Sequence, residues 1–233
     1  MSDRVCLVSG VGPGTGSALA KRFAASGYRV AMVARNAERL RELENEIEGS
    51  TGYPCDVSDR AALEKVLGAV RSELGAPNVV VHNAVGGAFG DFMATTPEIL
   101  RQNFEVNAIG LLHLAQLTVP DMIAAGDGAI VCTGNTSAHR GLANFSGFAP
   151  TKAAQRILAE SIARTAGPQG VHVAYVTIDA VIDLAWTRAL FKDKPDEFFI
   201  QPAHIADECF HVVQQPRSAW AFNVEIRPYA EQW

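Results

Sequence analysis

The 233-residue sequence has few cysteines, few charged residues and no long apolar run. Its four cysteines form no CxxC motif and no two histidines have metal-ligand spacing, so neither a disulfide framework nor a metal site is expected. No stretch approaches the ~18 apolar residues of a membrane-spanning helix, and the N-terminus leaves no room for a signal peptide. The net charge of -5 favours neither nucleic acid nor a membrane as a partner. We therefore expect a cytoplasmic protein with free thiols.

What the sequence does contain is a regular alternation of apolar segments and helical patterns. Hydrophobic residues make up 48% of the chain, enough for one sizeable core, and we predict a single domain over residues 1–233. Strand-like segments occupy residues 5–9, 28–34, 51–57, 79–82, 128–134, 171–177 and 220–226. Near-continuous apolar strands alternating with helices indicate an α/β fold of the Rossmann type, a doubly wound seven-stranded parallel sheet with helices on both faces.

Two local features of this pattern are predicted in more detail. Ser58 is expected to cap the helix that ends near Leu74. Residues 180–202 are too polar and broken for the core, and loops of this length are usually functional. We predict an irregular substrate or lid loop there.

The first strand ends in the glycine-rich stretch SGVGPGTG, residues 9–16. Such a turn between a strand and a helix lets the backbone approach a pyrophosphate and directs the helix N-terminus at it. A glycine-rich turn alone is a weak signal, but its position after the first strand is the one that a dinucleotide site requires. The predicted cofactor-binding residues of this turn are Gly10, Pro13, Gly14, Thr15 and Gly16.

The end of the second strand bears on which dinucleotide binds. A site for NAD normally presents Asp or Glu to the ribose 2′-hydroxyl about twenty residues after the glycine-rich turn. This sequence reads VARN there, placing Ala34 and Arg35 at that edge. Because an arginine pairs with a 2′-phosphate, we predict NADP rather than NAD. A solvated arginine at a helix start is the alternative.

Four motifs in order, SGVGPGTG, HNAV (82–85), VNAIG (106–110) and FAPTK (148–152), resemble those of the short-chain dehydrogenase/reductase family. The resemblance covers nearly the whole chain and implies a nicotinamide cofactor. Besides the glycines, the matching cofactor positions are Asp56 and Val57 against the adenine, Asn83 and Ala84 after the fourth strand, Lys152, and the backbone of Ile182. Asn107 matches the asparagine that holds a water in the family's proton relay. Leu184 stands where the family has a threonine that touches the nicotinamide amide.

The active-site segment departs from the family pattern. The resemblance expects a reactive Ser, a Tyr and a Lys, and the corresponding residues are Asn135, Phe148 and Lys152. No tyrosine lies four residues before any lysine, so the hydroxyl is absent rather than displaced. Phe148 has no proton to give to a substrate oxygen, and a lost general acid costs ~10²–10⁴ in rate without abolishing hydride transfer.

Few other groups are candidates for delivering the proton. His139 titrates near neutrality, although an exposed loop histidine is the plainer interpretation. Asp179 and Asp183 flank the predicted nicotinamide side and either reach the substrate or cap a turn, and Tyr175 is expected in the core.

Three functions remain open from the sequence. The first, which we favour because Lys152 and Asn107 are both retained, is an NADP-dependent oxidoreductase that acts on a small carbonyl, alcohol or activated alkene with atypical proton delivery. The second is an NADP-binding regulatory or structural protein without turnover, which Phe148 and Asn135 favour. The third is a lyase or isomerase on the same fold. Because family members pair through the helices near residues 107–123 and 148–166, we also expect a homodimer or homotetramer.

Overall fold

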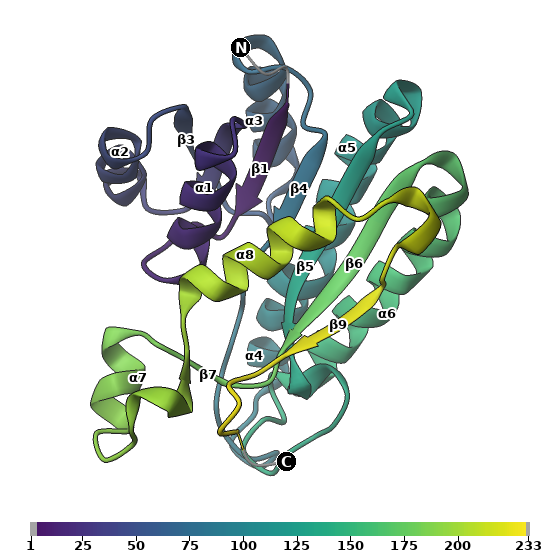
Figure 1. The fold of residues 1–233 in the computed structure, drawn as a ribbon. Coiled ribbons are helices and arrows are strands. Elements are labelled where there is room, and N and C mark those ends of the chain that lie inside the picture. The colour runs from purple at the N-terminus through teal and green to yellow at the C-terminus, as the bar shows by residue number, and fades with distance from the viewer. Residues whose placement is uncertain (1–3, 232–233) are drawn as a thin grey trace.

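The computed structural model describes residues 4–231 and contains the predicted parallel sheet (Figure 1). Its strands are β1 (Val5–Ser9), β2 (Arg29–Ala34), β3 (Ser50–Pro54), β4 (Val79–His82), β5 (Gly128–Asn135), β6 (Val171–Ile178) and β9 (Asn223–Ile226). They lie side by side in the order β3-β2-β1-β4-β5-β6-β9, and every neighbouring pair is parallel. The prediction of an α/β fold with a seven-stranded parallel sheet is confirmed.

Helices cover both faces of the sheet (Figure 1). On one face lie α1 (Thr15–Ala25), α2 (Ala37–Glu46) and α8 (Pro202–Val213), and on the other α3 (Arg60–Glu73), α5 (Gly110–Ala125) and α6 (Ala149–Ala166). All eight residues of β6 and seven of the eight in β5 are buried, because both faces of these strands pack against helices. This double burial is why the central strands are almost continuously apolar in the sequence.

The strand order reverses at β1. This strand pairs with β2 on one side and with β4 on the other, so the connections that leave the carboxyl ends of β1 and β4 run in opposite directions. In doubly wound sheets a crevice opens at such a reversal, and ligands bind there. The glycine-rich turn follows β1, and the HNAV motif spans the end of β4. Both motifs therefore meet at the expected crevice.

One helical run in the described part of the chain, Pro97–Ala125, is long and apolar enough to cross a membrane by length and composition alone. It comprises α4 (Pro97–Phe104), a π-helical turn (Glu105–Ile109) and α5. The run packs against α6, β4 and β5, and it buries the polar side chains of Asn103, Asn107 and Thr118. These contacts make it a covering helix of the sheet.

Two details of the sequence prediction are wrong. The cap of α3 is Asp59, whose Oδ1 accepts from the backbone N–H of Ala62 at 3.0 Å, whereas the Ser58 hydroxyl donates to Asp56. Residues 180–202 are not an irregular loop but contain β7 (Val181–Ile182), α7 (Ala185–Leu190) and β8 (Phe199–Ile200). Strands β7 and β8 pair with each other, and Ile200 of β8 is part of the core beneath α1 and α8, which ties this segment to the body of the protein.

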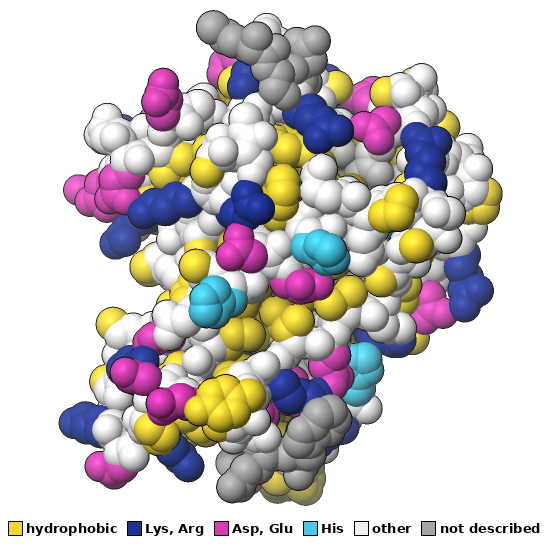
Figure 2. Space-filling model, in the orientation of Figure 1, with side chains coloured by type: hydrophobic (Ala, Val, Ile, Leu, Met, Phe, Trp, Pro, Cys, Tyr) yellow, Lys and Arg dark blue, Asp and Glu magenta, His cyan; other side chains and the backbone are white. Residues whose placement is uncertain are grey.

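The surface around α1 and α8 carries acidic and basic side chains in alternation, with apolar groups between them (Figure 2). Several of these charges are paired, such as Arg22 with Asp207 at 2.6 Å and Lys21 with Glu46 at 3.1 Å. Mixed charge of this kind gives no extended basic field on this face that would attract nucleic acid.

Candidate active site

A cleft of about 1420 Å³ lies at the carboxyl ends of the strands. Most of the residues predicted to bind the cofactor or to act in catalysis line it: Gly10, Pro13, Thr15, Gly16, Arg35, Asp56, Val57, Asn83, Ala84, Asn135, Phe148, Lys152 and Ile182. Gly14 and Asn107 do not line it. Gly14 lies beneath the side chain of Leu184, and Asn107 is completely buried.

The glycine-rich turn needs its glycines for steric reasons. Gly10 has φ +79°, and a Cβ on it would lie 2.4 Å from the backbone nitrogen of Ala84. Gly14 has φ +100°, and a Cβ on Gly16 would lie 2.5 Å from the Gly10 carbonyl oxygen. The turn thus brings the ends of β1 and β4 together and exposes the N-terminus of α1, which has no side-chain cap. Uncapped N–H groups at a helix start are suited to an anion such as a pyrophosphate.

The side chain of Asn83 holds this end of the sheet together. Its Nδ2 donates to the Gly10 carbonyl oxygen at 2.9 Å, and its Oδ1 accepts from the Thr133 hydroxyl at 3.0 Å. It therefore joins the ends of three adjacent strands, β1, β4 and β5. In this geometry Asn83 fixes the floor of the cleft between the two halves of the sheet.

Arg35 and Asp56 stand at one end of the cleft, after β2 and β3. Partial burial raises the pKa of Asp56, but two hydrogen bonds from Ser58 and the charge of Arg35 outweigh it, so the pKa lies below its usual range. Arg35 is exposed and forms no ion pair within residues 4–231. A guanidinium free to pair beside a polar carboxylate suits an adenosine that carries a 2′-phosphate.

Lys152 lies at the opposite end of the cleft, on the first turns of α6. Its ammonium donates to the Thr133 carbonyl oxygen at 3.1 Å and to Oε1 of Gln155 at 2.5 Å. Burial lowers the pKa of Lys152 to about 8, with a smaller opposite effect from Cys132. Phe148 lies one helical turn earlier, with its ring on the cleft wall.

Asn107 does not line the cleft, but its hydrogen bonds hold together the elements around Lys152. Its Oδ1 accepts from the Gly86 N–H at 3.0 Å, and its Nδ2 donates to the Gly86 carbonyl at 2.8 Å and to Thr151 Oγ1 at 2.8 Å. Its own backbone carbonyl accepts from Nε2 of Gln155 at 2.9 Å. The side chain therefore fastens the loop after β4 to α6.

Gln155 was missed by the sequence reasoning. It is completely buried and connects Lys152 to the Asn107 carbonyl, and it also accepts a long hydrogen bond from the Tyr175 hydroxyl at 3.4 Å. A signal was present, since Gln155 lies three residues after Lys152 and so on the same helix face. A polar residue on the inner face of a covering helix requires buried partners.

The other groups considered as proton donors do not line the cleft. His139 Nε2 lies 3.0 Å from the Thr177 hydroxyl, and Asp179 pairs with Arg227 at 3.2 Å. Tyr175 is in the core as predicted, with no exposed surface. Asn135 lines the cleft and keeps a free donor. Its Oδ1 accepts from the Ser137 N–H at 3.1 Å, and its Nδ2 donates to no residue between 4 and 231.

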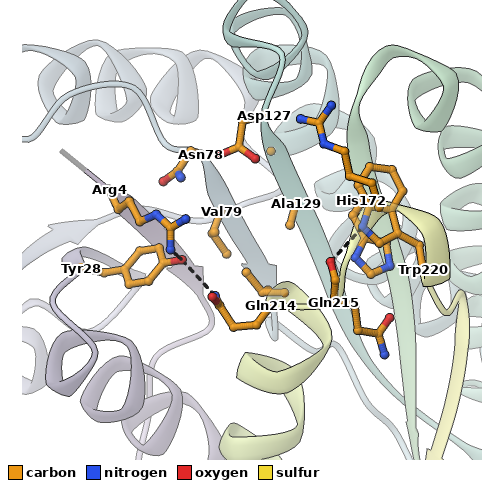
Figure 3. A pocket seen from close by; sticks show the side chains of 13 residues that line it. Arg4, Tyr28, Asn78, Val79, Asp127, Ala129, His172, Gln214, Gln215 and Trp220 are labelled. Carbon is orange, nitrogen blue, oxygen red and sulfur yellow. Dashed lines mark hydrogen bonds between the residues drawn. The ribbon is translucent and has the colours of Figure 1, made fainter. Parts of the chain in front are cut away.

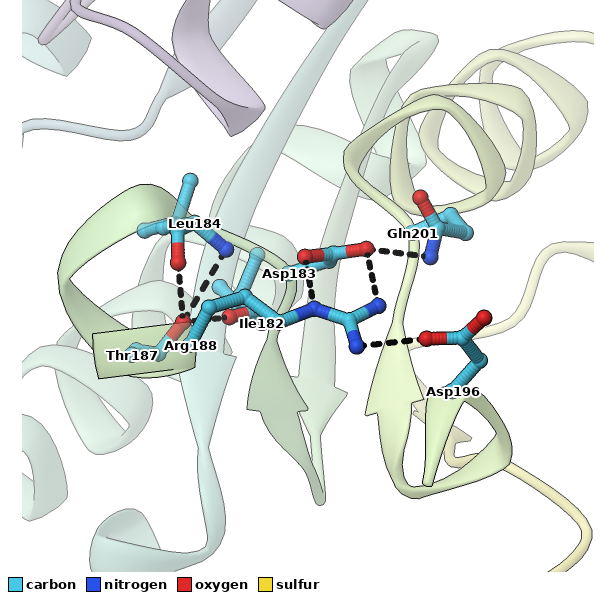
Figure 4. A network of polar contacts seen from close by, with 7 residues as sticks. All are labelled: Ile182, Asp183, Leu184, Thr187, Arg188, Asp196 and Gln201. Atoms are coloured by element: carbon cyan, nitrogen blue, oxygen red, sulfur yellow. Dashed lines mark hydrogen bonds and ion pairs between the residues drawn. The ribbon is translucent and has the colours of Figure 1, made fainter. Parts of the chain in front are cut away.

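Asp183 belongs to a network that stiffens the segment after β6 (Figure 4). Arg188 donates to both oxygens of Asp183, at 2.7 and 2.8 Å, and to Asp196 at 2.6 Å, while Gln201 donates to Asp183 at 2.7 Å. These hydrogen bonds, led by those from Arg188, lower the pKa of Asp183 to about 2. Asp183 is therefore a structural carboxylate, not an acid that meets the substrate.

A second cavity, of about 80 Å³, lies at the opposite end of the strands from the cleft, near their amino ends (Figure 3). Its lining is internally paired: Arg4 and Gln214 both donate to the Tyr28 hydroxyl, and the His172 ring stacks on Trp220 with centroids 4.8 Å apart. This cavity is far too small for a dinucleotide, and it joins α8 to the amino ends of the strands. Residues 4–231 contain no cluster of three or more His, Cys, Asp or Glu side chains that could hold a metal ion.

With this geometry in place, comparisons with known proteins identify the family. The sequence model of the short chain dehydrogenase family matches residues 4–191. The chain belongs to the short-chain dehydrogenase/reductase family. It is 32% identical over 180 residues to D-erythrulose reductase of Gallus gallus, an alignment that covers 77% of this chain and 72% of that protein.

Two solved structures of the family are similar over nearly the whole chain. A short-chain dehydrogenase from Rhodopseudomonas palustris has a TM-score of 0.85 and 30% identity, covering 98% of this chain and 100% of that one. A metagenomic short-chain oxidoreductase in complex with NADP has a TM-score of 0.84 and 27% identity, covering 98% of both chains. Relatives of this kind support an oxidoreductase with a nicotinamide cofactor.

Proposed function

We propose that this protein is an NADP(H)-dependent oxidoreductase that interconverts a small carbonyl compound and its alcohol. The observation that carries the proposal is the continuity of one cleft from Arg35, past the glycine-rich turn, to Lys152. Its volume of about 1420 Å³ accommodates a dinucleotide together with a substrate. The uncapped helix N-terminus at Thr15 and the steric need for Gly10 and Gly16 fit the cofactor's pyrophosphate.

The preference for NADP rests on Arg35. No carboxylate directly follows β2, where a site for NAD normally presents one to the ribose 2′-hydroxyl. The similarity to a short-chain oxidoreductase in complex with NADP supports the same assignment. Asp56, Val57 and Ala84 would hold the adenine and the middle of the cofactor, and Lys152 and the Ile182 backbone its nicotinamide half.

The chemistry that the cofactor supplies when bound is hydride transfer. Around the reacting carbon, the chain's own groups bind and orient. The free Nδ2 of Asn135 would donate to the carbonyl oxygen, and the Phe148 ring would form one wall of the site. Because Phe148 has no hydroxyl, the proton would come from solvent water, at a rate cost of ~10²–10⁴ against a positioned acid.

A second candidate function is favoured by a specific observation. Gln155 accepts from the Lys152 ammonium and donates to the backbone carbonyl of Asn107, the residue that matches the water-holding asparagine of the family's proton relay. Together with Phe148, this arrangement suits an NADP-binding protein without turnover. We prefer the oxidoreductase because orientation and proximity alone are large catalytic effects.

A titration of the purified protein with NADPH and NADH, followed by a panel of carbonyl compounds, separates the two candidates. Tight NADPH binding with turnover is the expected result. Tight binding without turnover would favour the second candidate, and no binding of either cofactor would remove both.

We further propose that the protein is cytoplasmic and forms a homodimer or homotetramer through α5 and α6. Ile157 on α6 is 57% exposed, and several apolar residues of both helices are only half-buried, which a partner helix would cover. Light scattering at micromolar concentration should therefore give a multiple of the 24.9 kDa chain mass. A monomeric mass would contradict this assembly.

A further inference from the structure

The end of the cleft near Lys152 opens between two apolar walls. Phe89, Phe145 and Phe148 form one wall, and Trp186, Leu190 and Phe191 form the other. Phe89 is 75% exposed, Trp186 58% and Leu190 67%. Large apolar side chains that remain this exposed beside a cleft mark a surface for an apolar ligand.

The first wall is a run of three rings that descends from the mouth of the cleft. The Phe89 and Phe145 rings meet edge to face with centroids 5.4 Å apart, and the Phe145 and Phe148 centroids are 6.4 Å apart at 44°. Phe148, at the inner end, is only 8% exposed. Such a run offers faces and edges to an aromatic ligand along its whole length.

This wall is built by hydrogen bonds between two loops. The Gly90 N–H donates to the Asn144 carbonyl at 2.9 Å, and the Ser146 hydroxyl donates to the Gly90 carbonyl at 2.9 Å. Thr95 Oγ1 lies 2.6 Å from Ser146 Oγ. These bonds hold Phe89 beside Phe145, and they give the hydroxyls of Thr95 and Ser146 partners within the protein.

The second wall lies on α7, below α1 and away from the sheet in Figure 1. The network of Arg188 with Asp183 and Asp196 holds this helix in place (Figure 4). None of these charged side chains lines the cleft, nor does any other charged residue of α7 or of the loops after β4 and β5. The charges that do line it are Arg35, Asp56, Glu105 and the buried Lys152.

We propose that the substrate is an uncharged ketone that carries an aromatic ring, either beside the carbonyl or fused to the ring that contains it. This inference rests on the proposed function and specifies its substrate class. The ring system would lie between the two apolar walls, and Asn135 Nδ2 would donate to the single oxygen. In the reduction, the carbonyl carbon gains a hydride from NADPH, which becomes NADP⁺, and the oxygen gains a proton from water, which leaves hydroxide.

The proposal sets this protein apart from the relative named for D-erythrulose, a short polyhydroxylated ketone. Several hydroxyls on a substrate need several polar partners, and a hydroxyl enclosed without one weakens binding. Asn135 offers a free amide donor at this end of the cleft, whereas Thr187 donates to the Ile182 carbonyl at 2.6 Å and Asn103 to the Gly147 carbonyl at 2.7 Å.

Calorimetric titration with 2-tetralone and with D-erythrulose, each with and without saturating NADPH, tests the proposal on the whole protein. We expect 2-tetralone to bind at least about tenfold more tightly than D-erythrulose. Phe89→Ala should weaken 2-tetralone binding about tenfold, since the ring covers the mouth of the cleft. Leu142→Ala is the matched control, because Leu142 is 53% exposed in the same region but does not line the cleft, and it should bind like wild type.

Tighter binding of D-erythrulose, or equal loss of 2-tetralone affinity in both variants, would overturn the substrate class. The NADPH titration is read separately. If NADPH binds while 2-tetralone does not, the substrate class is wrong and the proposed function stands. If 2-tetralone binds and responds to Phe89→Ala while NADPH does not bind, the apolar site stands and the proposed function is wrong.

Discussion

The ammonium of Lys152 donates to Oε1 of Gln155 at 2.5 Å, in a setting where Lys152 is 3% exposed and Gln155 not at all. Burial lowers the pKa of Lys152 to about 8, so the charge of this residue is lost only slightly above neutrality. The amide oxygen of Gln155 stabilises the charged form, because it accepts a hydrogen bond from it. Gln155, which is itself held by its hydrogen bond to the Asn107 carbonyl, is thus a positioning residue that keeps Lys152 charged and in place.

This relationship predicts how NADPH affinity depends on pH. In wild type the affinity should fall as pH rises through about 8, where Lys152 becomes neutral. Gln155→Leu removes the acceptor and should move this fall to lower pH, whereas Gln155→Glu adds a negative charge and should move it to higher pH. Fluorescence titrations between pH 6 and 10 provide the measurement. An identical midpoint in all three proteins would show that Lys152 does not respond to Gln155.

Phe148→Tyr tests the missing acid directly. The aromatic ring is already accommodated on the cleft wall, and the added hydroxyl lies one helical turn from Lys152. We expect carbonyl reduction with NADPH to rise, best in combination with Asn135→Ser, up to a ceiling of ~10²–10⁴. Steady-state rates on the best substrate of wild type are the measurement. A slower Tyr variant would indicate that the protein has its own effective proton route, and His139→Ala would be the next variant.

Arg35→Asp tests the choice of cofactor. A carboxylate at this position would repel the 2′-phosphate, so NADPH affinity should fall by more than about tenfold while NADH is affected less. Arg41→Asp makes the same change of charge at an exposed position on α2 outside the cleft and serves as the control. Equal losses for both cofactors in the Arg35 variant would show that Arg35 does not discriminate between them.

The burial of His82 predicts that the folded protein loses stability at acidic pH. It is completely buried with Nδ1 3.0 Å from the Ser9 hydroxyl, and burial, with the charge of Lys152, lowers its pKa to about 3. Below pH 6.5 the His82 ring is protonated in the unfolded chain but stays neutral in the folded protein until the pH approaches 3. The free energy of unfolding therefore falls as the pH decreases over this range. At pH 4 this effect amounts to about 3 kcal/mol.

The variant His82→Asn should lack this dependence, and its free energy of unfolding should decline less steeply than that of wild type between pH 6.5 and 3. Urea denaturation at several pH values measures the difference. His204→Asn, at an exposed position on α8, is the matched control. Parallel pH profiles for wild type and His82→Asn would contradict the account.

The architecture was predictable because each strand that is buried on both faces leaves an unbroken apolar segment in the sequence. The cleft was predictable for a similar reason, since Gly10 and Gly16 occupy positions where a Cβ would clash with backbone. Because this steric requirement fixes where glycine must stand after the first strand, it leaves a spacing that is visible in the sequence.

The parts that the sequence did not reveal depend on contacts between distant residues. Gln155 acquires its role only when α6 packs beside Asn107, 48 residues earlier in the chain. The segment 180–202 appeared irregular because its order comes from the side-chain network of Arg188, Asp183 and Gln201 rather than from local periodicity. The contact of Leu184 with Gly14 also joins residues that are far apart in the chain, so local sequence patterns do not reveal it.

The central claim is that this protein transfers a hydride between NADPH and a carbonyl carbon although position 148 is Phe. The most direct test uses NADPH deuterated at the transferable position, the purified protein, and a carbonyl panel that includes 2-tetralone, with mass spectrometry of the alcohol formed. The account predicts one deuterium at the carbinol carbon of the product. NADPH that binds tightly yet leaves no deuterium in any product would contradict it.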